Sequence, residues 1–389
     1  MRLRPTPEER QFADLAAEWL SRNVPREPRP PAGEPMAAFD RAWQRLQYDA
    51  GWAGVAWPKE YGGAGLSLVE QMIWFEQCAR FDAPEPGVLN IALGHAGPVL
   101  IAEGTDTQRQ DHLAAILRGD QVWAQGFSEP EAGSDLAALR TRGVVDGDHL
   151  VVDGTKIWTT GAHLSDWQEL LVRTDPAAAR HRGLSFAIVD LTTPGVEVRP
   201  ITAMDGKVHF AQVFYDGVRI PLRNLVGGLG DGWKVAMTTL GFERGTMTLG
   251  TVIRLLKLID DVKELARTRV DCRGQPLSTS DEVAARLADL EAEGVALHAL
   301  AVAFVSEVKR TGSSSAGSMI RPLYAELSQR VKRTGAELLG RDGLTTDGTD
   351  EAARFVPAYL HSFGHTIGTG TAEVQRNVIA HRVLGLPRG

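Results

Sequence analysis

Apolar residues near the start of the chain recur at the spacing of an amphipathic helix. The members of this pattern are Phe12, Leu15, Ala16, Trp19 and Leu20. The four residues before it, Thr6-Pro7-Glu8-Glu9, place a hydroxyl at the N-cap, a proline at the first helical position and an acid at the third. The sequence therefore predicts that the first helix starts here.

The pattern of apolar positions then changes twice along the chain. Helical spacing continues to about residue 118, apart from a proline-rich connector at 23–35 and a glycine-rich loop with aromatic residues at 51–65. From Gln121 to about Leu225 it gives way to short, turn-punctuated strands. These strands are RGVVDGDHLVVDGTKIW, which carries two Asp-Gly turns, LSFAIVDL, GVEVRPI and AQVFYDGVRIP.

Long amphipathic helices follow, and we expect them at 232–269, 280–310 and 318–340. Because no helices separate the strands, the middle of the chain is predicted to form an antiparallel barrel or sandwich rather than a parallel sheet. The predicted fold class is α+β, in the order helical, sheet, helical. We place the three domains at residues 1–120, 121–226 and 227–389.

Composition narrows the classes of function. The chain has 389 residues, 43% of them hydrophobic and 23% charged, as in ordinary globular proteins. A net charge of −7 argues against a nucleic-acid partner. Two cysteines are too few for a disulfide framework or a cysteine-built metal site. We find no signal-peptide pattern and no apolar run long enough to span a membrane, so we expect a cytoplasmic protein.

Three short segments have candidate chemistry. GGLGDG at 227–232 lacks the spacing of a dinucleotide fingerprint, and a hinge between domains is the favoured interpretation. His361 and His365 are four residues apart, but no acidic third ligand accompanies them, so we expect an ordinary polar pair and no metal. FSEPEAGSD at 127–135 has small side chains and turn residues that suit an anion or a flat heterocycle, although such turns are usually only structural.

FSEPEAGSD resembles the flavin-binding signature of the acyl-CoA dehydrogenase family. Four further segments agree in order with that family: WPKEYGGAG at 57–65, DGTKIWTTGAHLSDW at 153–167, FERG at 242–245 and GTAEVQRNVIAHRVLGLPR at 370–388. Together they span almost the whole chain. The resemblance implies a three-part architecture with an N-terminal helical domain, a middle antiparallel β domain and a C-terminal domain similar to a four-helix bundle.

The same resemblance implies FAD as cofactor and assigns residues to it. Phe127 and Ser128 would lie along the flavin ring and Ser134 would face the pyrophosphate. Trp158 would cover one side of the isoalloxazine, and Thr160 would hydrogen-bond near flavin N5. The C-terminal motif adds Thr371 and Glu373 as cofactor-binding positions.

Family members oxidise an acyl thioester to the 2,3-enoyl form, which requires a base for the Cα proton while hydride leaves Cβ for flavin N5. Many members carry that base as a glutamate near the C-terminus, and Thr369 occupies its place here. The other location in the family is the acid before arginine in FERG, which is Glu243. On a helix no basic residue lies three or four positions from Glu243, so an apolar face would raise its pKa toward the range of a general base. The alternative from the residues alone is an ordinary solvated helix acid. The resemblance also assigns Arg244 and Thr369 to the substrate.

Two positions depart from the family pattern. Members usually lend an arginine and a glutamine to the FAD of a neighbouring subunit, but here Asp271 and Glu337 stand at the corresponding places. Negative charge beside a pyrophosphate is unfavourable, so a sister subunit would have to supply the missing groups unless Arg269 or Arg273 substitutes. The chain is therefore expected to form either a homotetramer or a heteromer.

The resemblance leaves several functions open. The leading one is an acyl-CoA dehydrogenase that passes electrons to an electron-transfer flavoprotein or a similar acceptor. The alternatives are a non-catalytic or half-site subunit of a heteromeric dehydrogenase, a flavin oxidase or monooxygenase of the same fold, and a dehydrogenase of acyl-carrier-protein thioesters. Within the family, the sequence looks most similar to actinobacterial members that act on bulky acyl groups such as steroid side chains, in lipid or steroid catabolism.

Overall fold

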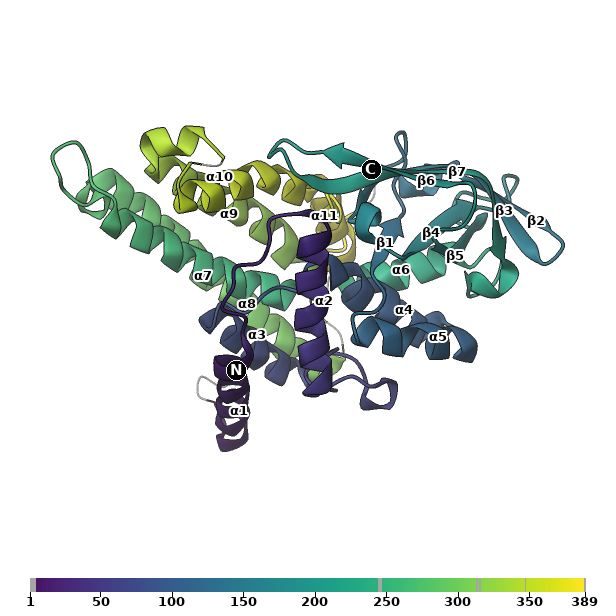
Figure 1. Cartoon of the computed structure of the whole chain (residues 1–389), viewed down its shortest axis with the longest axis horizontal. Helices are drawn as coiled ribbons and strands as arrows, with labels where there is room; N and C mark the ends of the chain where they lie inside the picture. The colour runs from purple at the N-terminus through teal and green to yellow at the C-terminus, as the bar shows by residue number, and fades with distance from the viewer. Residues whose placement is uncertain (1–4, 244–246, 313, 315, 347, 388–389) are drawn as a thin grey trace. The chain divides into compact units, whose positions relative to one another are not determined.

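A computed structural model describes residues 5–243, 247–312, 314, 316–346 and 348–387. The chain folds into two compact units, and each unit combines segments that are separated in the sequence. The helical unit comprises residues 1–22, 68–83 and 244–389, and the sheet unit comprises residues 23–67 and 84–243. Figure 1 labels the elements of both units.

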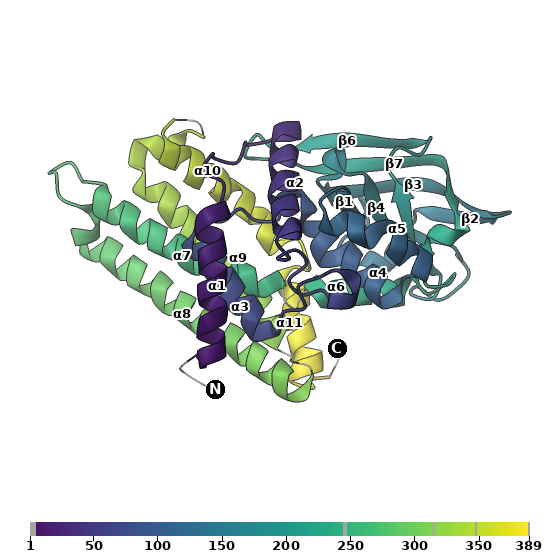
Figure 2. The ribbon, with the colours of Figure 1, turned by 60° about the horizontal axis from the view of Figure 1, so that its bottom comes forward.

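The helical unit is built around three long helices, α7 (Met247–Thr268), α8 (Asp281–Thr311) and α9 (Ala316–Leu338), which pack side by side (Figure 2). Its other helices are α1 (Pro7–Asn23), α3 (Leu68–Arg80), α10 (Asp350–Ser362) and α11 (Ala372–Val378). Buried Val252, Ile320 and Phe355 belong to one continuous core. The apolar stripes of these helices meet there, so burial away from water stabilises the unit.

Several helix predictions agree with the structure. Helix α1 begins at Pro7, and the Glu9 backbone N–H donates to the Thr6 hydroxyl oxygen (3.2 Å) while the Thr6 N–H donates to the Glu9 carboxylate (2.7 Å). The helices expected at 280–310 and 318–340 are α8 and α9. Of the helix expected at 232–269, the structure describes α6 (Gly232–Glu243) and α7, and residues 244–246 between them lie outside the described residues.

The sheet unit contains α2 (Gly33–Asp49), α4 (Gly97–Glu103), α5 (Asp106–Leu117) and α6 together with eight strands. The strands are β1 (Trp123–Gly126), β2 (Arg142–Asp146), β3 (His149–Thr160), β4 (Trp167–Arg173), β5 (Leu184–Asp190), β6 (Val196–Thr202), β7 (Val208–Pro221) and β8 (Leu225–Val226). They form one sheet in the order β6-β7-β3-β2-β4-β5-β8, with β1 paired to β4. One buried cluster includes Trp123 and Phe186, and another includes Leu150 and Val213.

The sheet is mainly antiparallel, as expected, with two exceptions at β4. Strand β1 pairs parallel with β4 through Trp123 and Trp167, and β2 meets β4 in parallel at Arg142 and Arg173. Tight turns join only antiparallel neighbours, whereas β4 is separated from β1 and β2 by longer stretches of chain that permit a parallel approach. The prediction of a purely antiparallel domain missed these two contacts.

Of the two Asp-Gly turns expected in this region, only the first is a hairpin turn. Gly147, with a φ of 61°, lies between β2 and β3. Gly154 lies within β3, where the register with β7 shifts between Val152 and Gly154. A Cβ atom at Gly154 would lie 2.7 Å from the Thr141 Cα. This glycine is therefore needed for a β-bulge with close backbone approach and not for a turn.

The GGLGDG segment, expected to be a hinge between domains, lies within the sheet unit. The Gly228 N–H donates to the Asp231 carboxylate (2.9 Å), and the Gly230 N–H donates to the Ser185 hydroxyl (3.0 Å). The first bond lies within the segment, and the second attaches it to β5 before α6 begins. Among the described residues, no helix has the length and apolar character needed to cross a membrane.

Candidate active site

The FSEPEAGSD segment lies beside the end of β3. The Ile157 backbone N–H donates to the Ser128 carbonyl oxygen at 2.9 Å, which brings the two motifs together. The Ser128 side chain is half-buried. The Phe127 side chain is only 5% exposed and meets Phe186 edge-on, with ring centroids 5.9 Å apart. Phe127 thus anchors the segment in the core, and Ser128 lies next to the exposed end of the strand.

Trp158 and Thr160 are exposed at that end of β3, whereas Thr159 between them is buried. Trp158 is 58% exposed and has a φ of 58°, a left-handed conformation that a bulky residue rarely adopts. It lies at a second shift in the β3–β7 register, between Lys156 and Thr159. Its ring meets Phe210 edge-on, with centroids 5.9 Å apart. The bulge therefore presents a large flat ring to the outside of the sheet.

A buried ion pair that the sequence analysis did not identify joins the two motifs beneath this surface. The Lys156 ammonium is fully buried, donates to a Glu129 carboxylate oxygen (2.8 Å) and donates to the Phe127 carbonyl oxygen (3.0 Å). The same carboxylate accepts the backbone N–H groups of Arg140 (2.6 Å) and Thr141 (2.9 Å). Both charged residues lie inside the quoted motifs, but neither motif by itself indicates that they pair.

For each of these two groups, burial and ion pairing shift the pKa in opposite directions. Burial lowers the Lys156 pKa to about 8, although the Glu129 charge acts to raise it. For Glu129, burial acts to raise the pKa, but the Lys156 charge and the hydrogen bonds from Lys156, Thr141 and the Arg140 N–H together bring it below its ordinary value. Both groups are therefore charged at neutral pH.

Ser134 lies in an exposed turn that follows the Glu129–Ala132 bridge. A Cβ atom at the neighbouring Gly133 would meet nothing within 4 Å, so the backbone there is open to an approaching group. Asp135, the next residue along the chain, pairs with Arg180. This pairing fixes one end of the turn.

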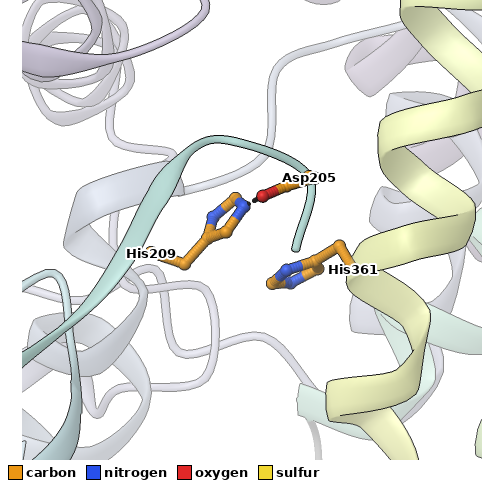
Figure 3. A group of neighbouring side chains, drawn as sticks. All are labelled: Asp205, His209 and His361. Carbon is orange, nitrogen blue, oxygen red and sulfur yellow. Dashed lines mark hydrogen bonds and ion pairs between the residues drawn. The ribbon is translucent and has the colours of Figure 1, made fainter. Parts of the chain in front are cut away.

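A second polar pair lies near Thr160. His209 Nε2 and the buried Asp205 carboxylate are 2.5 Å apart, and Asp205 also accepts the Lys207 N–H at 3.1 Å. Figure 3 marks the His209–Asp205 interaction with a dashed line. The His209 carbonyl accepts the Gly161 N–H at 3.0 Å. These bonds hold the β6–β7 turn against the residue that follows Thr160. The sequence analysis missed this pair, because an isolated Asp-x-x-x-His spacing has no specific meaning.

In the helical unit, Thr369 has a left-handed backbone with a φ of 59°. Arg321 of α9 hydrogen-bonds to the Thr369 hydroxyl and also donates to the carbonyls of His365 (3.0 Å) and Gly368 (3.1 Å). The Gln375 side chain donates to the Thr369 carbonyl at 3.2 Å. The loop at the position of the family glutamate is therefore held in place from α9 and α11.

Thr371 and Glu373 lie where α11 begins. The Thr371 hydroxyl accepts the Val374 N–H at 3.2 Å as an N-cap, and the Glu373 side chain is exposed. In the same unit His361 and His365 meet edge-on, with ring centroids 5.4 Å apart. Burial, followed by the positive charges of Lys332, His361 and Arg321, lowers the His365 pKa to about 3. His365 is thus neutral at physiological pH.

The predicted base and its neighbour are only partly described. Glu243 is the last residue of α6, and its side chain lies outside the described residues. Arg244 lies outside them altogether. Five other predicted site residues lie in the sheet unit, in segments 127–134 and 158–160. The hydrogen bond from the Ile157 N–H to the Ser128 carbonyl brings these segments together. The remaining three, Thr369, Thr371 and Glu373, lie in one stretch of the helical unit.

Both acids that depart from the family pattern have partners within the chain. Asp271 accepts the backbone N–H groups of Arg273 (2.8 Å) and Gln275 (2.9 Å), which closes a turn. Glu337 accepts from Arg333 and from Arg286, each at 2.7 Å. Arg269 is bound to Asp342 at 2.8 Å.

The sequence matches three family profiles in the order of the chain. The acyl-CoA dehydrogenase N-terminal domain matches residues 6–120, the middle domain matches residues 124–217, and the C-terminal domain matches residues 230–384. The chain belongs to the acyl-CoA dehydrogenase family. The three-part architecture and the oxidoreductase class are thereby confirmed.

Individual acyl-CoA dehydrogenases extend this match over nearly the whole chain. Acyl-CoA dehydrogenase IpdE1 of Mycobacterium tuberculosis is 39% identical over 360 residues, which cover 92% of this chain and 91% of that protein. Acyl-CoA dehydrogenase FadE29 of the same organism is 35% identical, covering 98% of each. Among solved structures, a "Tcur3481-Tcur3483 steroid ACAD" has a TM-score of 0.87 at 31% identity and full coverage of both chains. The ChsE4-ChsE5 complex from Mycobacterium tuberculosis gives 0.86 at 31% identity, also with full coverage of both chains.

Acyl-CoA dehydrogenases are FAD-dependent, and the sheet unit of this one fits a flavin. Trp158 is a large ring exposed from a strained backbone, and such strain is typical of ligand sites. The exposed Thr160 and half-buried Ser128 supply hydroxyl groups at the same end of β3. A flat heterocycle with polar edges requires this combination of an open aromatic face and nearby hydrogen-bonding groups.

Proposed function

We propose that this acyl-CoA dehydrogenase oxidises the Cα–Cβ bond of a bulky, steroid-derived acyl-CoA, with Glu243 as the base. The Glu243 carboxylate takes the proton from Cα, and a pair of electrons leaves Cβ as hydride, so that a C=C bond forms next to the thioester. Bound FAD supplies the hydride acceptor. The rest of the reaction depends on how the chain's own residues hold the thioester and the proton.

The observation that carries the assignment of the base is the environment of Thr369. This residue replaces the family glutamate, and its hydroxyl is engaged by Arg321. A threonine hydroxyl bound to a cation is not a base near neutral pH, because the positive charge acts against accepting a further proton. The acid that remains in a family base position is Glu243, at the end of α6.

Thr369 has a different role in this proposal. Its left-handed backbone is fixed by Arg321 and Gln375, and its N–H would donate to the thioester oxygen, where negative charge develops as the Cα proton leaves. Arg244 would bind the thioester or pantetheine end of the substrate. A rigid donor costs little reorganisation during the reaction, which suits this role.

On the cofactor side, Trp158 would cover one face of the isoalloxazine and Thr160 would donate near N5. Ser128 would bind the ring edge, whereas Phe127, whose side chain is buried against Phe186, would contribute through its backbone. Ser134 would face the pyrophosphate from the open turn beside Gly133. In the helical unit, the resemblance assigns Thr371 and Glu373 of the C-terminal motif to the cofactor.

The relatives support the proposed class of substrate and the proposed assembly. One similar structure is titled a steroid ACAD and another is titled a complex of two different chains. In this chain Asp271 and Glu337 replace the arginine and glutamine that would bind a neighbour's FAD, and Arg269 is occupied by Asp342. We therefore propose a heteromer in which a sister chain completes the FAD site. An electron-transfer flavoprotein or a similar acceptor would reoxidise the flavin.

Anaerobic titration of the purified holoenzyme with a panel of acyl-CoA thioesters tests this function. We expect steroid-derived thioesters to bleach the flavin absorbance and short straight-chain ones to bleach it poorly.

The Glu243→Gln variant should retain FAD, but substrate should reduce the flavin about a hundredfold more slowly than in wild type, or slower still. The reason is that an amide does not accept the α-proton. Glu264→Gln is the matched control, since Glu264 is an exposed helix acid paired with Arg267. Rapid reduction of the Glu243→Gln flavin would rule out this base.

A further inference from the structure

We propose that the buried Glu129–Lys156 ion pair is a positioning element for the flavin, which holds the FSEPEAGSD segment and the bulged end of β3 in one fixed arrangement. This inference rests on the proposed function, because it assumes that Ser128, Trp158 and Thr160 contact FAD. Neither charged residue would touch the cofactor in this proposal. Both would act through the backbone segments that they join.

The geometry links the pair to both cofactor segments. Lys156 immediately precedes the bulge that turns Trp158 outward, and its ammonium donates to the carbonyl of Phe127, next to Ser128. The Ile157 N–H donates to the Ser128 carbonyl itself. Two consecutive residues of β3 are therefore hydrogen-bonded to two consecutive residues of the flavin signature, and these bonds fix the relative placement of Ser128 and Trp158.

Glu129 extends this connection to the far side of the turn. Its carboxylate accepts the N–H groups of Arg140 and Thr141, which follow the turn that carries Ser134. The carboxylate thus joins the start of the signature, the chain after its end and β3. Within the described residues, the groups that donate hydrogen bonds to this carboxylate are the Arg140 N–H, the Thr141 N–H and the Lys156 ammonium, and all three belong to those segments.

Stability alone does not explain why charges occupy this position. Removing two charges from water costs about as much as their attraction returns, and buried ion pairs are often replaceable by apolar residues without loss of stability. An ion pair with defined hydrogen-bond directions instead specifies one arrangement of the groups around it. That property matters here, because Trp158 has a strained backbone that persists only when the surrounding structure determines it.

The test compares cofactor binding in neutralised variants of the holoenzyme. The double variant Lys156→Met/Glu129→Gln removes both charges and keeps one amide oxygen, which accepts one of the Arg140 and Thr141 N–H groups that bind the two oxygens of the carboxylate. We expect it to fold, to bind FAD about tenfold or more weakly and to give an altered visible circular dichroism of the bound flavin. The readouts are the FAD dissociation constant after reconstitution of the apoprotein and the visible spectrum, neither of which requires turnover.

The single variants separate positioning from folding. Lys156→Met leaves a buried carboxylate without its cation and is expected to be strongly destabilised. Glu129→Gln keeps the shape of the side chain, and the buried Lys156 can become neutral because burial already lowers its pKa to about 8, so this variant reports on FAD affinity even if Lys156→Met does not fold. Its FAD affinity should also fall, in the direction of the double variant.

A matched control removes another ion pair of the same unit, in which the acid is buried and the arginine is exposed. Arg29 binds the buried Asp40 through two hydrogen bonds, and Asp40 also accepts the Val88 N–H at 2.9 Å, outside both cofactor segments. Arg29→Met/Asp40→Asn should change the unfolding midpoint but leave the FAD dissociation constant and flavin spectrum unchanged.

The outcomes are distinct. Wild-type FAD affinity and spectrum in the double variant would overturn the positioning role, and so would an equal loss of affinity in the Arg29/Asp40 control. The proposed function is judged separately, by whether an acyl-CoA reduces the wild-type flavin. A wild-type protein that is reduced by substrate alongside an unaffected double variant would refute only the positioning role.

Discussion

His365 is a described histidine whose surroundings strongly lower its pKa. Its ring stacks on Tyr324 with centroids 6.1 Å apart, and its Nδ1 atom has no hydrogen-bond partner among the described residues. Burial and the nearby positive charges of Lys332, His361 and Arg321 disfavour the protonated ring. The residue therefore connects the stability of the helical unit to pH.

The direction of this linkage follows from the two pKa values. The folded-state value, about 3, is below the ordinary value of 6.5, so the unfolded chain binds the additional proton between these values. The contribution of His365 to stability is complete above pH 6.5 and is lost as the pH falls toward 3. At pH 5, protonation of His365 in the unfolded chain lowers the free energy of unfolding by about 2 kcal/mol.

We predict that His365→Phe, which keeps a ring and removes the titrating group, flattens the loss of stability in acid. Urea midpoints measured at pH 7.5 and pH 5 should differ less in the variant than in wild type. His381→Phe, in an exposed part of the C-terminal segment, serves as the control and should retain the wild-type slope. Equal slopes in all three proteins would contradict the linkage.

At the scale of elements, β3 determines most of the geometry of the sheet unit's candidate site. The strand pairs with β2 on one side and with β7 on the other, and its register with β7 shifts twice. The first shift, at Gly154, allows the backbone to approach Thr141, and the second turns Trp158 outward. Bulges of this kind re-aim side chains and are frequent next to active sites.

We predict that Gly154→Ala destabilises the protein by about 2 kcal/mol or more, because the added Cβ would meet the Thr141 backbone and the φ of 148° is unsuited to alanine. Gly147→Ala is the control: its φ is 61°, but a Cβ atom there meets nothing within 4 Å. The control should lose only about 1 kcal/mol, the cost of a positive φ. Urea unfolding measures both losses, and equal losses would show that close approach at Gly154 contributes nothing.

At the scale of the whole molecule, we propose that the chain has an intact set of residues for its own flavin and an altered set for a neighbour's. Asp271 closes a turn and Glu337 is bound between two arginines, so both acids have structural partners within the helical unit. A homo-oligomer would place acids where the family usually places an arginine and a glutamine. A sister chain that carries those two residues would remove this conflict.

We predict that the chain purified alone binds substoichiometric FAD, and that co-expression with such a sister chain gives an assembly with one FAD for each chain of this protein. Mass measurement in solution and the ratio of flavin to protein absorbance check both statements. Glu337→Gln, which restores the family residue, should raise the FAD content of the chain when it is expressed alone. A stable, active homotetramer with one FAD per chain would rule out the need for a sister chain.

The sequence by itself determined the order of the fold and the identity of the motifs. Helical and alternating apolar patterns are local, so the start of α1 at Pro7, the span of α8 and α9 and the strand-rich middle part were predictable. The family was predictable as well, because five motifs in order leave little room for coincidence, and the profile matches confirm it. The roles of Glu243, Trp158 and the other site residues stay predictions.

Only the tertiary structure decided how distant segments combine. The parallel contacts of β4, the bulge at Gly154 and the grouping of α1 and α3 with the C-terminal helices depend on contacts between residues far apart in the chain. The Glu129–Lys156 pair has the same origin: each residue has an unremarkable place in its own motif, and only folding brings their charged groups to 2.8 Å from each other in a buried site. Periodicity reports which face of an element is buried, but not which element buries it, and for that reason these pairings were beyond the sequence.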